Sequence, residues 1–560
     1  MTATLYDTTL APLDITLDGP PPARPPLWRR YVPRIRQWLV AHRVDMLIVA
    51  MLMVVAGQIH AHGMYTSPSR FDDEGTYTAY AWAVQNWHLL SHYTYWYAHP
   101  PVGWLQIAAW NTLTDAFDRA PYAVAAAREF MLVCKLVSIV LLYGLGRRLG
   151  FGRLGCVVSV VIFAISPLAV YFTRAALLDN VVTPWLIGAF FFAASPRRST
   201  RGAVAAAVCL AAAVLSKETA LLYLPALILL LWQHTDRRNR RFTLSLFAAW
   251  FVLICAVFPL YALIKNELLI GPGHVSLEGA VRWQLFERTG SGSIFDEKST
   301  AHAVIRSWLK QDPWLPRLVL ALALPGLLIR RTRAVAVAFV IQVAQLLRGG
   351  YLPYPYVIAM IPFAALTIGG VVDWLWRCHT VFAARLSNPR VRTGLSRGWR
   401  LLVAGACAWM TVMVAATWQY PLRDLRVLDR DGGKAAALSW VLKNAPKSAY
   451  LVVDDSLWVD LVRAGHPADH VIWFTKLDVD QDVQIPGEHP WARISYVVLD
   501  REDDLSVHMQ GDGLPSKDTL RQFPTLGKAL QNSRMVAAFG TGLDSITVRA
   551  VDPTLAKARK

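Results

Sequence analysis

Long apolar runs, separated by short polar and basic segments, recur along most of the chain. A helix that crosses the hydrocarbon core of a bilayer needs roughly 20 mostly apolar residues. Runs of this kind begin near Val44, Tyr122, Leu154, Leu178, Ala203, Ala220, Thr243, Trp314, Ala334, Pro355 and Leu401. The pattern predicts a polytopic α-helical membrane protein with about eleven spans.

Arginine clusters alternate with these runs and set the expected orientation. One cluster, within residues 29–43, precedes the first run. The others follow every second run, at residues 147–153, 197–201, 237–241, 330–333 and 377–400. Basic residues concentrate in cytoplasmic loops, so all clusters share one side if the count is eleven. We therefore expect a multi-pass plasma-membrane protein with its N-terminus in the cytoplasm and its C-terminus outside.

One further apolar segment tests this layout. His99 to Leu113 is only about 15 residues long, which is short for a span. Counting it as a span would move the cluster at 147–153, and every later one, to the outside. We therefore expect an interfacial or re-entrant helix here. Small and aromatic residues at helical spacing predict a second external helix from Asp73 to Trp87.

The composition changes after Tyr420. Short strand-like segments at 450–453, 471–474, 496–499, 535–539 and 545–548 alternate with helical ones at 435–443, 457–464 and 518–530. This alternation predicts a small α/β domain. The expected organisation is a cytoplasmic basic and Pro-rich segment at 1–43, a transmembrane domain at 44–420, and an extracytoplasmic α/β domain at 421–560. No cleavable signal peptide is expected, because the first segment is polar and then basic.

Composition agrees with a membrane protein. The chain of 560 residues is 54% hydrophobic and only 17% charged, and its 22 tryptophans are consistent with aromatic belts at lipid headgroups. The net charge of +18 would suggest nucleic acid on a soluble protein, but here the excess lies in loops that set orientation. We expect a lipid-bilayer partner and no nucleic acid. The six cysteines show no disulfide or metal-thiolate spacing.

With this topology, most remaining charged groups collect on the external side. The acidic triplet Asp72, Asp73 and Glu74 is the most informative of them. One acid could cap the helix that follows, with the others in its first turn. One could instead act as a general base with a raised pKa, or the group could help to bind a divalent metal. No cofactor is firmly predicted, and a metal remains possible.

Other external side chains have both structural and functional interpretations. His99, followed by Pro100 and Pro101, could be an ordinary interfacial residue or part of a site. Arg174 could pair with Asp179, and Lys217 with Glu218. Arg348 with Tyr351, Tyr354 and Tyr356 could bind a phosphate or form an interface belt. Together these groups could let cations hold a phosphate while a carboxylate removes a proton.

Several of these segments resemble a known family. Residues 70–77 (RFDDEGTY), 99–103 (HPPVG) and Arg128 resemble the start of the GT-C glycosyltransferases. The closest group is the protein O-mannosyltransferase-like and aminoarabinose-transferase-like family. Residues 171–179 (YFTRAALLD), 216–218 (SKE) and 351–362 (YLPYPYVIAMIP) lie where that family has similar segments. The resemblance covers about residues 40–420 and implies a GT-C fold.

The resemblance also implies an activity and roles for residues. It implies an inverting transfer of a sugar from a polyprenyl-phosphate donor to an unknown acceptor: a protein, a glycan or a lipid. Asp73 would be the catalytic carboxylate with Glu74 beside it, and the donor phosphate would be held by residues among His99, Lys217, Arg348, Tyr351 and Arg174. The acidic pair of the family is a triplet here, so Asp72 is an alternative base. The missing acid near His99 argues against lipid A modification.

Two other function classes stay open. A transporter or flippase of lipid-linked sugars would show charged residues near mid-bilayer and repeated halves, and neither is evident in the sequence. A non-catalytic cell-envelope assembly protein would use the α/β domain to bind a partner. The long external loop at 265–312, with its Gly290-Ser-Gly-Ser293 segment, is expected to be a mobile lid.

Overall fold

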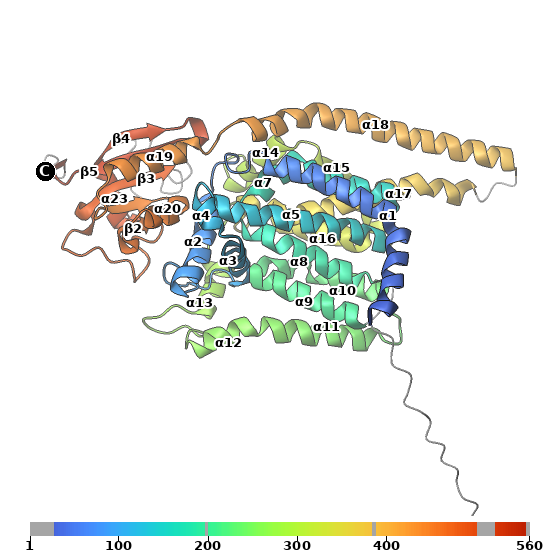
Figure 1. Ribbon diagram of the computed structural model, residues 1–560, viewed down its shortest axis with the longest axis horizontal. Coiled ribbons are helices and arrows are strands. Elements are labelled where there is room, and N and C mark those ends of the chain that lie inside the picture. Colours follow the sequence, from blue (N-terminus) through green and yellow to red (C-terminus); the bar gives the residue numbers. More distant parts are fainter. Residues whose placement is uncertain (1–26, 196–199, 384–387, 501–520, 556–560) are drawn as a thin grey trace, which may run out of the picture. The chain divides into compact units, whose positions relative to one another are not determined.

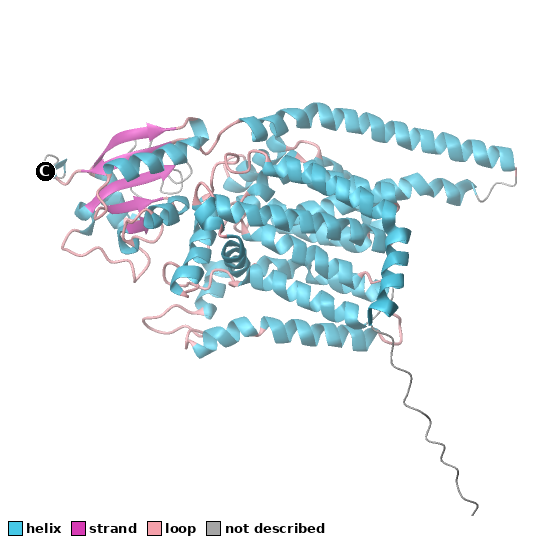
Figure 2. Ribbon diagram, in the orientation of Figure 1, coloured by secondary structure: helices cyan, strands magenta, loops and turns pink. Residues whose placement is uncertain are grey.

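The computed structural model describes residues 27–195, 200–383, 388–500 and 521–555. Helices make up most of this chain, and the described strands all lie in its C-terminal region (Figure 1, Figure 2). The helices before that region are α1 (Leu27–Ala61), α2 (Asp72–Trp87), α3 (Val102–Thr114), α4 (Ala116–Arg119), α5 (Ala123–Arg148), α6 (Arg153–Ile165), α7 (Pro167–Arg174), α8 (Leu178–Ala193), α9 (Thr200–Ser216), η1 (Glu218–Tyr223), α10 (Leu224–His234), α11 (Arg240–Cys255), α12 (Val257–Ile264), α13 (Leu277–Arg282), η2 (Trp283–Glu287), α14 (Thr300–Gln311), α15 (Leu315–Leu328), α16 (Arg333–Leu346), η3 (Tyr354–Tyr356), α17 (Val357–Ala383) and α18 (Pro389–Val427).

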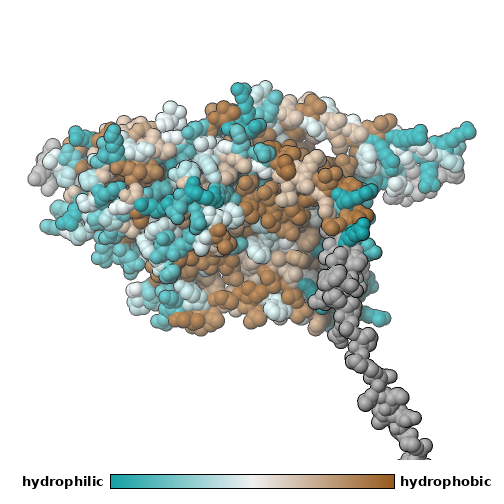
Figure 3. All heavy atoms as spheres, in the orientation of Figure 1, coloured by the Kyte–Doolittle hydropathy of each residue, from teal (hydrophilic) through white to brown (hydrophobic). Residues whose placement is uncertain are grey.

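Each of the predicted apolar runs coincides with a helix or a helix pair. Among the described residues, five helices are long and apolar enough to cross a membrane, or six if the bent pair α6 and α7 is one span. Four shorter apolar helices, α8, α9, α15 and α16, have only 14 to 17 residues. The structure therefore confirms a membrane protein with several apolar helices, and the count of eleven stays a prediction. Hydrophobic residues gather over the helical region in Figure 3.

The bend between α6 and α7 is stabilised by polar side chains. The two helices meet at 56°, where Ser166 caps α7 and Pro167 has no N–H to continue α6. Carbonyl oxygens at such a break lose their helical partners. Lys135 donates to the Phe163 carbonyl at 2.7 Å, and the His60 ring lies 2.8 Å from the Ala164 carbonyl. Lys135 is thus a buried amine inside a candidate span, which the sequence pattern did not single out.

The two expected external helices are both present. Helix α2 covers Asp72–Trp87, as predicted to within one residue at its start. Helix α3 covers Val102–Thr114 and has 13 residues, which is about 20 Å and too short to cross a bilayer. Helices α15 and α16, which belong to the predicted spans, are only one residue longer, so the exclusion of this segment from the spans stays a prediction.

The C-terminal region contains one mixed sheet. Its strands are β1 (Tyr450–Val453), β2 (Val471–Trp473), β3 (Ile494–Asp500), β4 (Ser533–Phe539) and β5 (Ile546–Val551). Their order is β2-β1-β3-β5-β4, with β1 parallel to β2 and β3, and β5 antiparallel to β3 and β4. The other elements are α19 (Gly432–Asn444), η4 (Asp455–Leu457), α20 (Trp458–Arg463), η5 (Ala468–His470), η6 (Pro490–Arg493), α23 (Pro524–Gln531) and η7 (Gly542–Asp544). All five predicted strands are confirmed; part of the predicted helix at 518–530 lies outside the described residues.

Alternation along β1 gives the sheet two apolar faces. Leu451 and Val453 belong to one buried cluster, and Val452 belongs to the other. The first cluster continues into α2, α4 and α5, because it also contains Ala79, Phe117 and residues near the start of α5. One face of the sheet layer therefore packs against the helices that surround the acidic triplet. Helix α18 runs to Val427, beyond the expected domain boundary at 420.

Candidate active site

The acidic triplet opens helix α2, and its three side chains have different surroundings. The Glu74 carboxylate is fully buried and forms a two-point ion pair with Arg128, at 2.6 and 2.8 Å. It also accepts hydrogen bonds from the backbone N–H groups of Phe71 at 3.0 Å and Ala176 at 2.6 Å. Both oxygens are thus bonded inside the protein, and Glu74 ties the start of α2 to α5 and to the segment after α7.

Asp72 faces the C-terminal region. Its two oxygens accept from the backbone N–H of Asp455 at 2.9 Å and from the indole N–H of Trp473 at 3.0 Å. Burial raises the pKa of Asp72 well above its usual range, and the charges of Asp454 and Asp455 raise it further. A raised pKa suits a general base. Both oxygens, however, are held by groups of the C-terminal region.

Asp73 is the exposed member of the triplet. It lies in the first turn of α2, where the helix dipole favours a negative charge. Within the described parts of the chain, its carboxylate accepts no hydrogen bond and forms no ion pair. Its charge nevertheless acts on Tyr77, Lys217 and Tyr351, so these groups lie around it. Asp73 is therefore a carboxylate available to a ligand and surrounded by polar groups.

Lys217 supplies a buried cation near this carboxylate. Its ammonium donates to Asp179 at 2.7 Å, and both side chains are less than a tenth exposed. Burial alone would lower the pKa of Lys217, but the charges of Asp179, Glu218 and Asp73 hold it above the ordinary lysine value. These carboxylates therefore favour the positively charged form of Lys217. The two local pairs considered from the sequence do not form: Asp179 pairs with Lys217 instead of Arg174, and Glu218 pairs elsewhere.

His99 joins the same group of side chains through Glu218. Its Nδ1 lies 2.8 Å from the Glu218 carboxylate, and the two side chains are 19% and 44% exposed. The imidazole also lies beside the Tyr77 ring, at 6.2 Å between centroids. The structure thus brings the HPP and SKE segments together beside α2.

Tyr351 and Arg288 form the side of the site that comes from the later loops. The Arg288 guanidinium lies 3.3 Å from the centroid of the Tyr351 ring. Partial burial raises the pKa of Tyr351, with Asp73 raising it and Arg288 lowering it. Tyr351 therefore contacts the Arg288 cation and is influenced by the charge of the Asp73 carboxylate. The sequence did not identify Arg288 as a site residue, because no local pattern in the loop at 265–312 indicates a contact with Tyr351.

Two predicted phosphate ligands are placed differently. Arg174 is buried, and its guanidinium donates to four backbone carbonyls, those of Ile59, His62, Ser67 and Leu425. It therefore holds loops together and has few donors left for a ligand. Arg348 is exposed, and its side chain makes no hydrogen bond or ion pair within the described residues. Its role as a phosphate ligand stays a prediction, because its side chain would have to turn toward a bound donor.

The long loop at 265–312 contacts the segment that carries Arg348 and Tyr351. Ser291 donates its backbone N–H to the Gly350 carbonyl at 3.2 Å, and its hydroxyl accepts from the Leu352 N–H at 2.9 Å. Gly292 in the same stretch has a left-handed φ of +79°. The loop therefore rests on one edge of the site. Its expected role as a mobile lid stays a prediction.

The C-terminal region closes another side of the site through buried polar contacts. Arg70 pairs with Asp431 at 2.9 Å, and Lys434 pairs with Asp454 at 2.5 Å while also donating to the Arg70 carbonyl at 2.8 Å. Gly75 lies against backbone there: a Cβ at this position would be 2.1 Å from the Ser456 nitrogen. Helix α2, which carries Asp73, is thus held by α5 through Glu74 and by the C-terminal region through Gly75 and Arg70. Among the described residues, no group of three or more His, Cys, Asp or Glu is arranged to hold a metal ion.

Comparisons with known proteins agree with this arrangement. Residues 98–261 match the model of the family described as dolichyl-phosphate-mannose-protein mannosyltransferase. This match confirms the resemblance predicted from the sequence, and the proteins of that family are glycosyltransferases, the predicted class of enzyme. A comparison with curated protein sequences finds no match.

Solved structures show the same fold. ArnT from Cupriavidus metallidurans, bound to undecaprenyl phosphate, matches with a TM-score of 0.55 at 16% identity, over 92% of this chain and 99% of that one. The Archaeoglobus fulgidus oligosaccharyltransferase, tethered with an acceptor peptide, matches with a TM-score of 0.54 at 13% identity, over 90% of this chain and 74% of that one. The chain therefore has the GT-C fold.

Proposed function

We propose that this chain transfers a sugar from a polyprenyl-phosphate carrier to an acceptor at the external membrane face, with Asp73 as the general base. One observation carries the proposal. Of the three acids at the start of α2, Glu74 and Asp72 have both oxygens engaged, whereas Asp73 is exposed and bonded to none of the described residues. Asp73 is therefore the acid that can reach a substrate.

The proposed reaction is a single displacement with inversion. An acceptor hydroxyl or amine loses its proton to the Asp73 carboxylate as its heteroatom bonds to the anomeric carbon. The bond from that carbon to the phosphate oxygen breaks on the opposite face, and the polyprenyl phosphate leaves with the electron pair. Lys217 and Arg288 offset the negative charge that develops on the leaving phosphate. No step requires a nucleotide sugar or a metal ion.

The positions of the surrounding side chains support these roles. The charges of Lys217 and Asp73 both influence the pKa of Tyr351, so the cation and the base lie within electrostatic reach of the same phenol. The imidazole of His99 is held by Glu218, which leaves its second nitrogen to face a phosphate. Glu74 and Arg128 do not touch the substrate in this proposal. They position the first turn of α2.

The solved relatives support the proposed carrier. ArnT was solved with undecaprenyl phosphate, and the archaeal oligosaccharyltransferase was solved with dolichol phosphate and an inhibitory peptide. Both carriers are polyprenyl phosphates. By analogy we propose a polyprenyl-phosphate sugar as the donor here. The acceptor can be a protein, a glycan or a lipid.

A deletion of the gene tests the reaction class, whichever sugar is transferred. A transferase consumes the lipid-linked sugar, so the deletion should remove one envelope glycan and accumulate its polyprenyl-monophosphate sugar. Mass spectrometry of glycans and lipid extracts measures both. If the protein were a transporter, its deletion would instead leave the donor on the cytoplasmic face, where sealed cells protect it from a membrane-impermeant periodate probe. Finding the accumulated donor protected in that way would contradict the proposal.

A further inference from the structure

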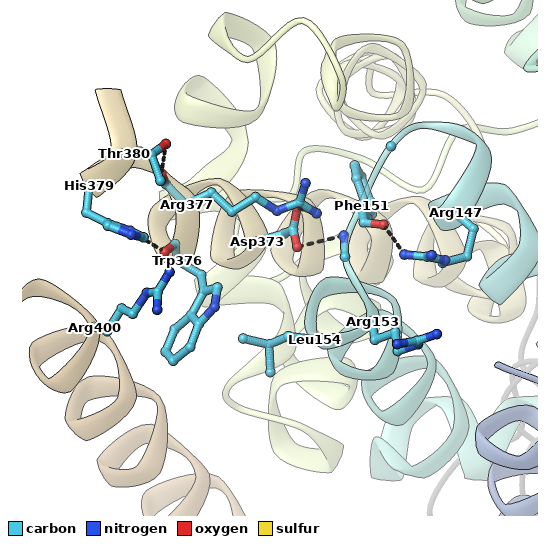
Figure 4. Close-up of a pocket in the computed structure, with 12 residues that line it drawn as sticks. Arg147, Phe151, Arg153, Leu154, Asp373, Trp376, Arg377, His379, Thr380 and Arg400 are labelled. Carbon is cyan, nitrogen blue, oxygen red and sulfur yellow. Dashed lines mark hydrogen bonds and ion pairs between the residues drawn. The ribbon is translucent and has the colours of Figure 1, made fainter. Parts of the chain in front are cut away.

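A polar cavity lies among the arginines of the clusters at residues 147–153 and 377–400. Its volume is about 590 Å³, which is within the range of small-molecule sites, about 300–1,000 Å³. The end of α5, the start of α6, the C-terminal half of α17 and the first third of α18 all contribute to its lining (Figure 4). Its lining includes Arg147, Gly152, Arg153, Leu154, Asp373, Trp376, Arg377 and Arg400.

This cavity is separated from the candidate active site by the length of the helices. Helix α5 carries Arg128 beside the acidic triplet and Arg147 in the cavity, 19 residues further on, which is about 28 Å along the helix. Helix α17 begins just after Tyr356 and reaches the cavity at Asp373. The hydrocarbon core of a bilayer is about 30 Å thick. The cavity is therefore near the opposite membrane surface from Asp73.

The lining carries a strong excess of positive charge. Four arginines line the cavity, against one carboxylate, that of Asp373. Both Asp373 oxygens are already engaged, one by the Gly152 N–H at 2.8 Å and the other by Arg377 at 2.6 Å. The carboxylate thus neutralises one arginine in the wall. Arg147, Arg153 and Arg400 also line the cavity, so arginines outnumber carboxylates in its lining.

The start of α6 adds a second feature that favours an anion. This helix of 13 residues begins at Arg153, and its N-cap is Gly152, which provides no side-chain cap. Gly152, Arg153 and Leu154 all line the cavity. The first N–H groups of a helix and the positive end of its dipole bind phosphate groups. Backbone donors and guanidinium groups therefore surround the same space.

The cavity also has an apolar wall, which distinguishes a lipid from a soluble anion. Leu154 is 40% exposed and points toward the Trp376 ring (Figure 4). The Arg400 guanidinium lies 6.0 Å from the centroid of that ring. On α18, next to Arg400, Leu401 is 73% exposed. Tryptophan beside arginine at the end of apolar helices is typical of the headgroup region of a bilayer.

We propose that this cavity binds the phosphate headgroup of an anionic phospholipid, on the membrane surface opposite to the glycosyl-transfer site. The arginines and the start of α6 hold the phosphate, while Leu154 and Trp376 contact the first part of the lipid tails. The site binds a structural or regulatory lipid. It does not depend on the proposed reaction, because none of its residues reaches the acidic triplet.

Native mass spectrometry of the full-length chain tests this proposal directly. The purified protein is titrated with phosphatidylglycerol, cardiolipin or phosphatidylcholine in detergent, and the bound lipid is counted. The test variant is the double substitution Arg153→Gln and Arg400→Gln. The matched control is Arg392→Gln and Arg397→Gln, which removes two exposed charges from α18 outside the cavity lining. A third variant, Arg153→Lys and Arg400→Lys, keeps the charge, and size-exclusion chromatography checks that each variant is folded.

The wild type should bind the anionic lipids at least about tenfold more tightly than phosphatidylcholine. The glutamine pair should weaken anionic lipid binding about 30-fold, the lysine pair much less, and the control pair hardly at all. Equal binding of anionic and zwitterionic lipids by the wild type would overturn the proposal. So would unchanged binding by the glutamine pair. Displacement of the lipid by excess inorganic phosphate would overturn the lipid assignment and indicate a soluble phosphate ligand.

Discussion

The substitution Gly75→Ala tests how closely the C-terminal region holds the helix that carries Asp73. Gly75 lies inside α2, two residues after Asp73. A Cβ there would be 2.1 Å from the Ser456 nitrogen and 2.2 Å from the Asp455 carbonyl carbon, whereas unstrained contacts are about 3.5–4.0 Å. Both neighbours are backbone atoms, so no rotamer change can relieve the contact. Helix and loop must separate by more than about 1 Å.

The expected cost follows from this displacement. In an exposed helix, replacing glycine by alanine stabilises by about 0.5–1 kcal/mol. At Gly75 the sign should reverse, with a loss of about 1–3 kcal/mol from overpacking. A shift of about 1 Å at a catalytic group can cost about 100-fold in rate. Thermal unfolding of the purified protein measures the first effect, and sugar transfer in membranes measures the second.

Gly394→Ala is the matched control. Gly394 lies in helix α18, and a Cβ there would have no neighbour within 4 Å. That variant should be as stable as the wild type or slightly more stable, with full activity. If Gly75→Ala behaved like Gly394→Ala in both assays, the close packing between α2 and the C-terminal loop would be refuted.

Three further substitutions test individual contacts. Glu74→Gln leaves the buried Arg128 charge without its partner, so the unfolding free energy should fall by about 3–5 kcal/mol, measured by thermal or denaturant unfolding; an unchanged value would contradict the buried pair. Burial raises the folded-state pKa of Asp72, so its contribution to stability is present below the unfolded pKa of about 3.9 and is lost as pH rises through the folded pKa. As the pH rises from about 3.9 through the folded-state pKa of Asp72, the unfolding temperature should therefore fall more for the wild type than for Asp72→Asn. Parallel curves for the two proteins would refute the raised pKa of Asp72. Arg288→Gln removes the cation over Tyr351 and should raise the KM for the donor about tenfold or more, with a smaller effect on kcat; an unchanged KM would remove Arg288 from the site.

Helical elements were predictable because their signals are local. Apolar runs predicted the long helices of the first 420 residues but not short ones such as α4 and α13, and alternating segments predicted each strand of the sheet. Span number was less predictable, because several helices are shorter than a bilayer is thick. The contact of Lys135 was not predictable either. Its partner, the Phe163 carbonyl, belongs to a helix break 28 residues away, which no local pattern reveals.

The sequence identified the acidic residues of the candidate site better than its cationic residues. The motif identified Asp73, but the different surroundings of Asp72 and Glu74 depend on partners far along the chain, such as Trp473 and Arg128. Spacing suggested that Arg174 pairs with Asp179, yet the chain folds so that Arg174 meets backbone carbonyls. Sequence separation does not determine which long side chain fills a given gap. That choice is set by how the helices pack.

The most direct test of the account is the rate of sugar transfer by Asp73→Asn compared with Asp72→Asn in membranes that contain the natural donor. Asp469→Asn, on an exposed part of the C-terminal region, serves as a control for the loss of one carboxylate. The account predicts that Asp73→Asn loses transfer by about 100-fold or more while remaining folded. Asp72→Asn should retain measurable transfer, and Asp469→Asn should be fully active. Full activity of Asp73→Asn would contradict the proposed base.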